Sequence, residues 1–197
     1  LTRSRYQGNC RCGNGSYNLT GGTHTVTNDL NLGYYSGGNG TYNLSGTGSL
    51  SVEADEFIGF GTGGTGSTGT FTQTGGTHTV TNALSIGSYT GSNGSYNLSG
   101  NGSLSAADEF IGYLGTGSFT QSGGTNMVSN SLHLGSCSGD SGTYNLSGTG
   151  SLSVGGYEFI GRYGTGAFTQ SGGTHTVTST LYLGDFDGGN GTYNLNG

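Results

Sequence analysis

The sequence has no proline, tryptophan or lysine, and it carries little charge of either sign. Only 7% of its 197 residues are charged, whereas 46 are glycine. A composition so far from the globular average argues against a domain with one conventional core. Disorder is not favoured either, because disordered chains usually carry a high net charge and this chain carries −6.

The scarcity of positive charge and of long apolar runs argues against nucleic-acid binding and against a membrane span. Four arginines form no basic stripe that could neutralise phosphates, so we expect no nucleic-acid partner. No apolar run approaches the ~20 residues of a membrane helix, so we expect no membrane span. The start, Leu1 to Arg5, shows no signal-peptide pattern and no initiating Met, which predicts a mature product or an excerpt of a longer protein.

A short motif with an aromatic anchor recurs along the chain. One form reads Gly-Thr-Tyr-Asn-Leu-Ser-Gly at 40–46, and a related form reads Gly-Thr-Phe-Thr-Gln at 69–73. The anchors are Tyr17, Tyr42, Phe71, Tyr96, Phe119, Tyr144, Phe168 and Tyr193. Their spacing gives a repeat of about 24 residues, and one longer interval comes from an insertion near 62–67, which we expect in a loop.

Each repeat contains three short runs in which apolar and small polar residues nearly alternate, with glycine between the runs. This pattern predicts an all-β, single-chain parallel β-solenoid (β-helix) with three short strands per coil and roughly seven coils. Residues 17–197 are expected to form the solenoid, and 1–16 a divergent partial coil. Stacking at about 4.8 Å would place the eight anchors in one aromatic core ladder about 34 Å long.

The facing of the second strand in each coil stays open. Leu104 lies eight residues after Tyr96, but Val80 lies nine after Phe71, and a slip of one residue reverses every side chain. If Leu104 and Val80 both point inward, the threonines beside them form a regular outer hydroxyl face. Its members would be Thr23, Thr25, Thr77, Thr79, Thr174 and Thr176.

The unit formed by Gly-Thr-Tyr-Asn-Leu-Ser-Gly at 142–148, Glu-Phe-Ile-Gly at 158–161 and the Phe-Thr-Gln segment at 166–177 resembles a known family of repeats. These are the autotransporter-associated and exosortase-sorted (PEP-CTERM-type) β-strand repeats of large bacterial surface proteins. The resemblance covers nearly the whole chain. It implies a passenger-like parallel β-helix at the cell surface or outside the cell, with no catalytic motif. The segment from Arg3 to Cys12 departs from the pattern.

Histidine recurs at one repeat position, in His24, His78 and His175, with Asn126 in the remaining copy. Neighbouring copies would lie about 10 Å apart along the axis, too far to share one metal ion. We expect these histidines to be surface or half-buried strand residues. His133 lies outside this position.

Acidic residues also recur every two coils. Repetition argues against catalysis, because an active site needs one distinct constellation, so we expect neither an enzyme nor a cofactor. We expect no metal site either, and a weak divalent-cation site at these acidic residues is the alternative. Its candidate ligands are Asp55, Glu56, Asp108, Glu109 and Glu158.

The three cysteines are an odd number, which leaves at least one thiol free or bonded to another chain. Cys10 and Cys137 share one repeat position five coils apart, about 24 Å, whereas a disulfide needs Cα atoms within about 7 Å. Cys10 could reach Cys12 only through a strained loop. Intermolecular disulfides and free thiols therefore both stay open.

Neither end reads as a capping coil, which predicts head-to-tail stacking of molecules into a homopolymer. Three arginines lie in the first 11 residues and two aspartates near the other end, so opposite charges could set the polarity. The self-association candidates are Arg3, Arg5, Arg11, Asp185, Asp187, Tyr193 and Leu195. A junction of this kind would have a short coil, with 12 residues from Tyr193 to the next Gly8 against 16 or 17 elsewhere.

These observations favour a structural component of an extracellular or cell-surface fibre or matrix. The alternative is an adhesin segment that binds glycan or another surface through its Ser/Thr face. A polysaccharide-acting enzyme and an ice-binding protein are less favoured. An enzyme should hold unmatched ionisable residues at a break in the repeat, and only the first residues and the 62–67 insertion break it.

Overall fold

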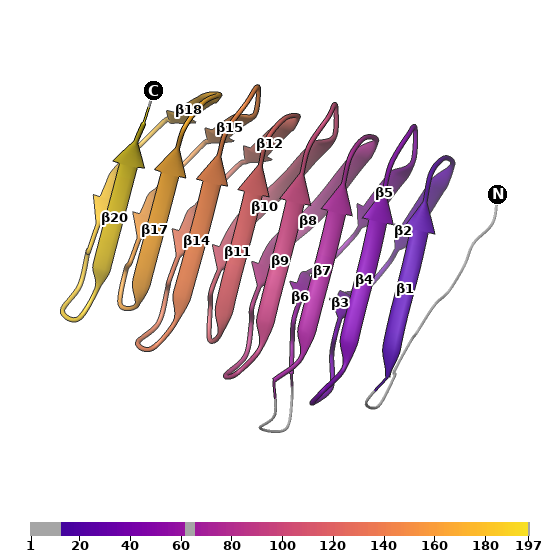
Figure 1. Ribbon diagram of the computed structural model, residues 1–197, viewed down its shortest axis with the longest axis horizontal. Coiled ribbons are helices and arrows are strands. Elements are labelled where there is room, and N and C mark those ends of the chain that lie inside the picture. The colour runs from indigo at the N-terminus through magenta and orange to yellow at the C-terminus, as the bar shows by residue number, and fades with distance from the viewer. Residues whose placement is uncertain (1–12, 62–65, 197) are drawn as a thin grey trace.

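A computed structural model describes residues 13–61 and 66–196, and every regular element in these ranges is a β-strand (Figure 1). No described segment is a helix that could cross a membrane. Eight strands form the first sheet, in chain order and all parallel. They are β1 (Asn14–Leu19), β4 (Asn39–Leu44), β7 (Thr68–Gln73), β9 (Asn93–Leu98), β11 (Thr116–Gln121), β14 (Ser141–Leu146), β17 (Thr165–Gln170) and β20 (Asn190–Leu195).

The second sheet has twelve strands in two neighbouring rows. The first row contains β2 (Thr23–Val26), β5 (Ser49–Val52), β12 (Thr125–Val128), β15 (Ser151–Val154) and β18 (Thr174–Val177). The second row contains β3 (Leu30–Leu32), β6 (Glu56–Ile58), β13 (Leu132–Leu134), β16 (Glu158–Ile160) and β19 (Leu181–Leu183). Two longer strands, β8 (Thr77–Ile86) and β10 (Ser103–Ile111), run through both rows.

The chain passes once through the first sheet and twice through the second in every coil. The result is a parallel β-solenoid of about seven turns, with about 25 residues per turn and three strands per coil, which confirms the predicted fold class. Figure 1 shows the strands of the first sheet side by side, from indigo at β1 to yellow at β20. The register matches repeat to repeat, since Tyr17 pairs with Tyr42 and Phe119 with Tyr144.

Most residues of the predicted divergent segment (1–16) and of the insertion (62–67) lie outside the described residues. Of the predicted partial coil 1–16, residues 1–12 are not described, but Asn14 to Ser16 already belong to β1 and pair with Asn39 to Thr41. Within the insertion, 62–65 are not described. Gly66 and Ser67 accept backbone hydrogen bonds from Gly37 and Asn93 in the neighbouring coils.

The eight aromatic anchors form one stacked row through the interior. Successive ring centroids lie 4.6–5.0 Å apart, close to the spacing of the strands that carry them. Rings at this separation attract each other by about 0.5–1.5 kcal/mol per pair beyond the effect of burial. Val, Ile and Leu of the second sheet pack against this row to complete a narrow core.

The structure settles which way the second strand of each coil faces. Leu50 pairs with His78, and Val52 pairs with Val80, so leucine and histidine occupy one inward row. The corner before β5 contains four residues (45–48), whereas the corner before β8 contains three (74–76). This one-residue difference in corner length explains the ambiguous spacing in the sequence, because the strand register itself does not slip.

Glycine is required where two backbone segments meet at a corner. Gly112 ends β10 with φ +72°, a left-handed conformation that side chains with a Cβ rarely adopt. Gly117 in β11 faces this corner, and a Cβ there would collide with Gly112 N and Ile86 O. The glycines of this position therefore allow the two sheets to approach each other.

Replacing Gly117 with alanine should destabilise the protein by about 1–3 kcal/mol, because the new methyl group would overlap fixed backbone atoms. Gly21→Ala is a matched control, since its Cβ would meet only Thr47 Oγ1 at 3.5 Å. Denaturant unfolding of both variants measures the difference. Equal stability of the two variants would contradict this account of the corner.

Candidate functional site

The interior contains a chain of polar side chains that crosses three successive coils. His78 of the third coil lies between Glu56 of the second and Tyr96 of the fourth. Its Nε2 is 2.7 Å from Glu56 Oε2, and its Nδ1 is 2.9 Å from the Tyr96 hydroxyl oxygen. Both Glu56 and His78 are almost wholly buried. A buried carboxylate is tolerated only with such a partner.

A glutamine completes the network and fixes its hydrogen-bond directions. The Tyr96 hydroxyl donates to Gln73 Oε1 at 2.6 Å, while Gln73 Nε2 donates to the carbonyl oxygens of Gly76 and Ser103. Since the tyrosine hydrogen is directed to Gln73, its oxygen accepts from the Nδ1–H of His78. The other ring nitrogen of His78, Nε2, is left facing Glu56 Oε2.

The same network recurs along the solenoid. The third copy, with separations of 2.9, 3.0 and 2.7 Å between successive partners, contains Glu158, His175, Tyr193 and Gln170. The second copy, with separations of 3.1, 3.3 and 2.6 Å, contains Glu109, Asn126, Tyr144 and Gln121. His24 makes the corresponding 2.9 Å bond to Tyr42.

The copy with asparagine differs in its electrostatics, because the Asn126 amide cannot become positively charged beside the Glu109 carboxyl group. Burial raises the pKa of Glu109 to about 8, and the hydrogen bond from Asn126 only partly opposes this rise. Burial likewise lowers the pKa of His24 and raises the pKa of Tyr96 and Tyr144. At neutral pH the Glu109 carboxyl is therefore largely protonated.

The expectation of surface or half-buried histidines is wrong for His24 and His78, which are 7% and 1% exposed, whereas His175 is half-buried. Sequence reasoning missed the network because it treated the histidines and the glutamates separately, each as possible metal ligands. The sequence does contain a signal. Leucine occupies the histidine position in a neighbouring coil, as Leu50 does beside His78, and it occupies the glutamate position in a neighbouring coil, as Leu84 does beside Glu56. A polar residue in a row of leucines indicates an inward polar group with a partner.

The proposed cation ligands do not converge. Glu56 points inward to His78, while Asp55 Oδ1 accepts the backbone N–H of Ala83 at 3.0 Å. Asp108 Oδ1 accepts the N–H of Ser131 in the same way. Across residues 13–61 and 66–196, no three His, Cys, Asp or Glu side chains gather in a metal-binding group. The structure therefore does not bring the candidate cation ligands together, and the aspartates join neighbouring coils at a corner.

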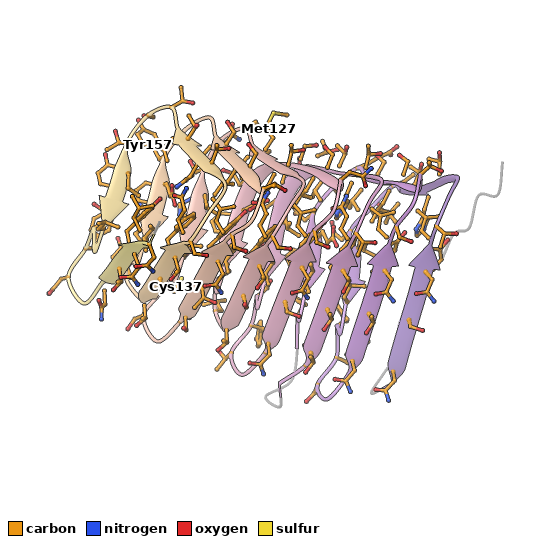
Figure 2. The ribbon with its side chains drawn as sticks, turned by 45° about the horizontal axis from the view of Figure 1, so that its top comes forward. Met127, Cys137 and Tyr157 are labelled. Carbon is orange, nitrogen blue, oxygen red and sulfur yellow. The ribbon has the colours of Figure 1, made fainter. Side chains whose placement is uncertain are left out.

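The predicted hydroxyl face lies on the outside of the first row of the second sheet. All six predicted threonines are exposed. Many hydroxyls bond along the axis, as Thr77 does to Ser49 and Thr174 to Ser151, both at 3.1 Å. Met127, which is 56% exposed, interrupts one hydroxyl row and projects away from the ribbon (Figure 2).

A second outer feature, which sequence reasoning missed, is a row of rings beside the hydroxyl face. It occupies one outward position in the second row of the second sheet, where only Asn31 of β3 and Ser85 of β8 are not aromatic among the described strands. Three successive centroid distances of 4.7, 4.8 and 4.9 Å join Phe110, His133, Phe159 and Tyr182. Burial, with a smaller contribution from nearby Arg162, lowers the pKa of His133 to about 4, so the ring is neutral at pH 7. The sequence signal for this row is the recurring Glu-Phe-Ile motif, whose central phenylalanine lies between two inward residues and therefore faces outward.

An open groove of about 270 Å³ interrupts this outer aromatic row between the second and fourth coils. Its lining is mostly apolar and contains no Asp, Glu, Lys or Arg. The lining residues are Phe57, Phe60, Ser85, Ser88, Tyr89, Phe110, Tyr113 and Leu114.

Of the cysteine candidates, only Cys137 lies in the described residues, where it is a free, half-buried thiol (Figure 2). Burial raises its thiol pKa, and Asp140 beside it adds to the rise. This environment disfavours a reactive thiolate. Cys10 and Cys12 lie outside the described residues, as do Arg3, Arg5 and Arg11.

The self-association candidates near residue 197 differ in exposure and in charge pairing. Asp185 lies 3.7 Å from Arg162 of the preceding turn, so its charge is partly matched within the molecule. Asp187 is exposed, and Leu195 is 70% exposed. Tyr193 is half-buried in the stacked row, where it contacts Phe168.

Comparisons with protein-family models, with curated proteins and with solved structures find no match to this chain.

The Glu109 carboxyl should make stability depend on pH. Its folded pKa of about 8 lies above the ordinary 4.5, so the folded state holds the proton more tightly than the unfolded state. Stability is then full below about pH 4.5 and falls as pH rises to about 8, by up to about 1.4 kcal/mol per pH unit. Denaturant unfolding across this range should show the fall.

Glu109→Gln should flatten this dependence, because the amide has no proton to lose. The exposed Glu53→Gln is the matched control and should keep the slope of the unaltered protein. An unchanged slope in Glu109→Gln would show that the buried carboxyl does not titrate in this range.

Proposed function

We propose that this chain is a structural component of an extracellular or cell-surface fibre or matrix, extended by head-to-tail stacking of solenoid units. The observation that supports this most is the use of the buried ionisable groups. Glu56 and His78 are enclosed in the core and bonded from coil to coil, so their chemistry serves cohesion along the axis. The resemblance to bacterial surface repeats agrees with this function.

The coil that ends at β20 presents a surface suited to a further coil. Leu181, Leu183 and Leu195 are 39%, 50% and 70% exposed. The equivalents of Leu181 and Leu183 two turns earlier, Leu132 and Leu134, are fully buried because another coil covers them. A following coil, from a second molecule or from continuing chain, would remove this apolar surface from water.

The polar network favours one stacking direction. Gln73 donates to Gly76 in its own coil and to Ser103 in the next, but Gln170 makes only the first of these bonds, to Gly173. The parallel strand edge of β20 is also paired on one side alone within the described residues. A further coil laid on this edge in the same direction would supply both sets of partners.

The alternative function is an adhesin segment that binds glycan through the Ser/Thr face. The exposure of all six predicted threonines supports it. The hydroxyls that bond one another, such as Thr77 and Ser49, have less capacity left for a ligand. Fibre formation is therefore the proposal that we favour.

Negative-stain electron microscopy over a range of protein concentrations, with and without reductant, tests this proposal. We expect unbranched filaments of constant width that lengthen with concentration. Loss of filaments in reductant would assign the junction to cysteines. Discrete short rods at every concentration would contradict head-to-tail assembly and favour the adhesive alternative.

Leu183→Asp provides a sharper test, because it places a charge on the apolar surface that stacking would bury. It should abolish filaments while leaving the circular-dichroism spectrum unchanged. The matched control is Thr176→Asp on the exposed hydroxyl face, which should still polymerise. Equal polymerisation of both variants would exclude this edge as the junction.

A further inference from the structure

Between Phe57 and Tyr182, the outer aromatic row has one missing ring. Ser85 pairs with Phe57 on one side and with Phe110 on the other, so the position that carries an aromatic side chain in both neighbouring coils carries serine here. Phe57 and Phe110 are two coils apart, about 9.6 Å along the axis. The groove described above lies at this gap, and Ser85 is one of its lining residues.

The next interval of the same row shows what fits such a gap. His133 also lies between two phenylalanines two coils apart, Phe110 and Phe159. Its neutral imidazole stacks on them at centroid distances of 4.7 and 4.8 Å, with interplanar angles of 13°. A two-coil interval in this row therefore accommodates one planar ring in contact with both neighbours.

The walls and the size of the groove are suited to a ring from outside the chain. Phe60 contacts Phe57 and Tyr89, and Tyr113 contacts Phe110, so further rings extend the lining on both sides; Leu114 completes it. Tyr89, Tyr113 and Leu114 remain 37–41% exposed, so apolar surface faces the opening. Its 270 Å³ exceeds the roughly 150 Å³ of an apolar cavity that accepts benzene.

We propose that this gap is a binding site for the planar, uncharged aromatic or heteroaromatic ring of a small molecule. The ring would stack between Phe57 and Phe110 and occupy the place that His133 fills in the next interval. Its class follows from the lining, which offers aromatic rings from both neighbouring coils, no ionised group, and the hydroxyls of Ser85 and Ser88 for a single polar atom. This site does not depend on fibre formation.

Indole is a suitable probe, because the chain contains no tryptophan and indole emission can be excited where tyrosine does not absorb. Titration of the full chain should shift indole emission to shorter wavelength and raise its anisotropy, with one site per chain and a dissociation constant of about 1 mM. Absence of binding up to the solubility limit of indole would overturn the proposal.

Two substitutions make the test specific. Ser85→Tyr fills the gap with the protein's own ring and should weaken indole binding at least tenfold, while raising the melting temperature. Ser105→Tyr, at an outward position of the hydroxyl face, is the matched control and should bind as the unaltered chain does. Unchanged binding in Ser85→Tyr would place the indole elsewhere and contradict the assignment.

The converse substitution should create a second site. His133→Ser removes the ring between Phe110 and Phe159, and the stoichiometry should rise from one indole to two per chain. A stoichiometry that stays at one would contradict the argument from the repeat. Binding of glucose or cellobiose in place of indole, lost in Ser85→Tyr, would instead show that the gap accepts sugar rings and would overturn the aromatic assignment.

Discussion

A carboxylate buried inside a narrow β-solenoid needs a polar partner, because an unpaired buried charge is costly. In this protein Glu56 obtains that partner from His78, one coil further along, and His78 bonds in turn to Tyr96 in the coil after that. The polar network therefore fixes the order of the coils as well as their cohesion. Stacked rings and leucines alone would allow any coil to follow any other.

This requirement accounts for the two alternating forms of the repeat. One form supplies the glutamate and the tyrosine, and the other supplies the histidine or asparagine and the glutamine. Each form leaves a buried polar group unpaired unless the other form lies next to it, which would be costly. The outside of the solenoid escapes this constraint, so Ser85 can replace an aromatic ring in the outer row and leave a gap.

Much of the fold was predictable from the sequence, because the aromatic anchors and glycines recur at a fixed spacing. The ladder from Tyr17 to Tyr193 and the parallel coils both follow from that period. The inward facing of His78 was not predictable from counting residues after the anchor, since a corner one residue shorter compensates for the shift. Glu56 and His78 pair although they lie 22 residues apart in adjacent coils. Their pairing becomes visible only when the sequences of the coils are aligned.

The central claim is that Glu56 and His78 act as a unit, and a double-mutant cycle tests it most directly. Leucine is the natural substitute, since Leu84 and Leu50 occupy the same two positions in neighbouring coils. Glu56→Leu and His78→Leu should each lose about 3–5 kcal/mol of unfolding free energy, because each leaves a buried polar partner alone. The double variant should be nearly as stable as the unaltered protein. Additive losses, with no coupling between the two positions, would contradict the account.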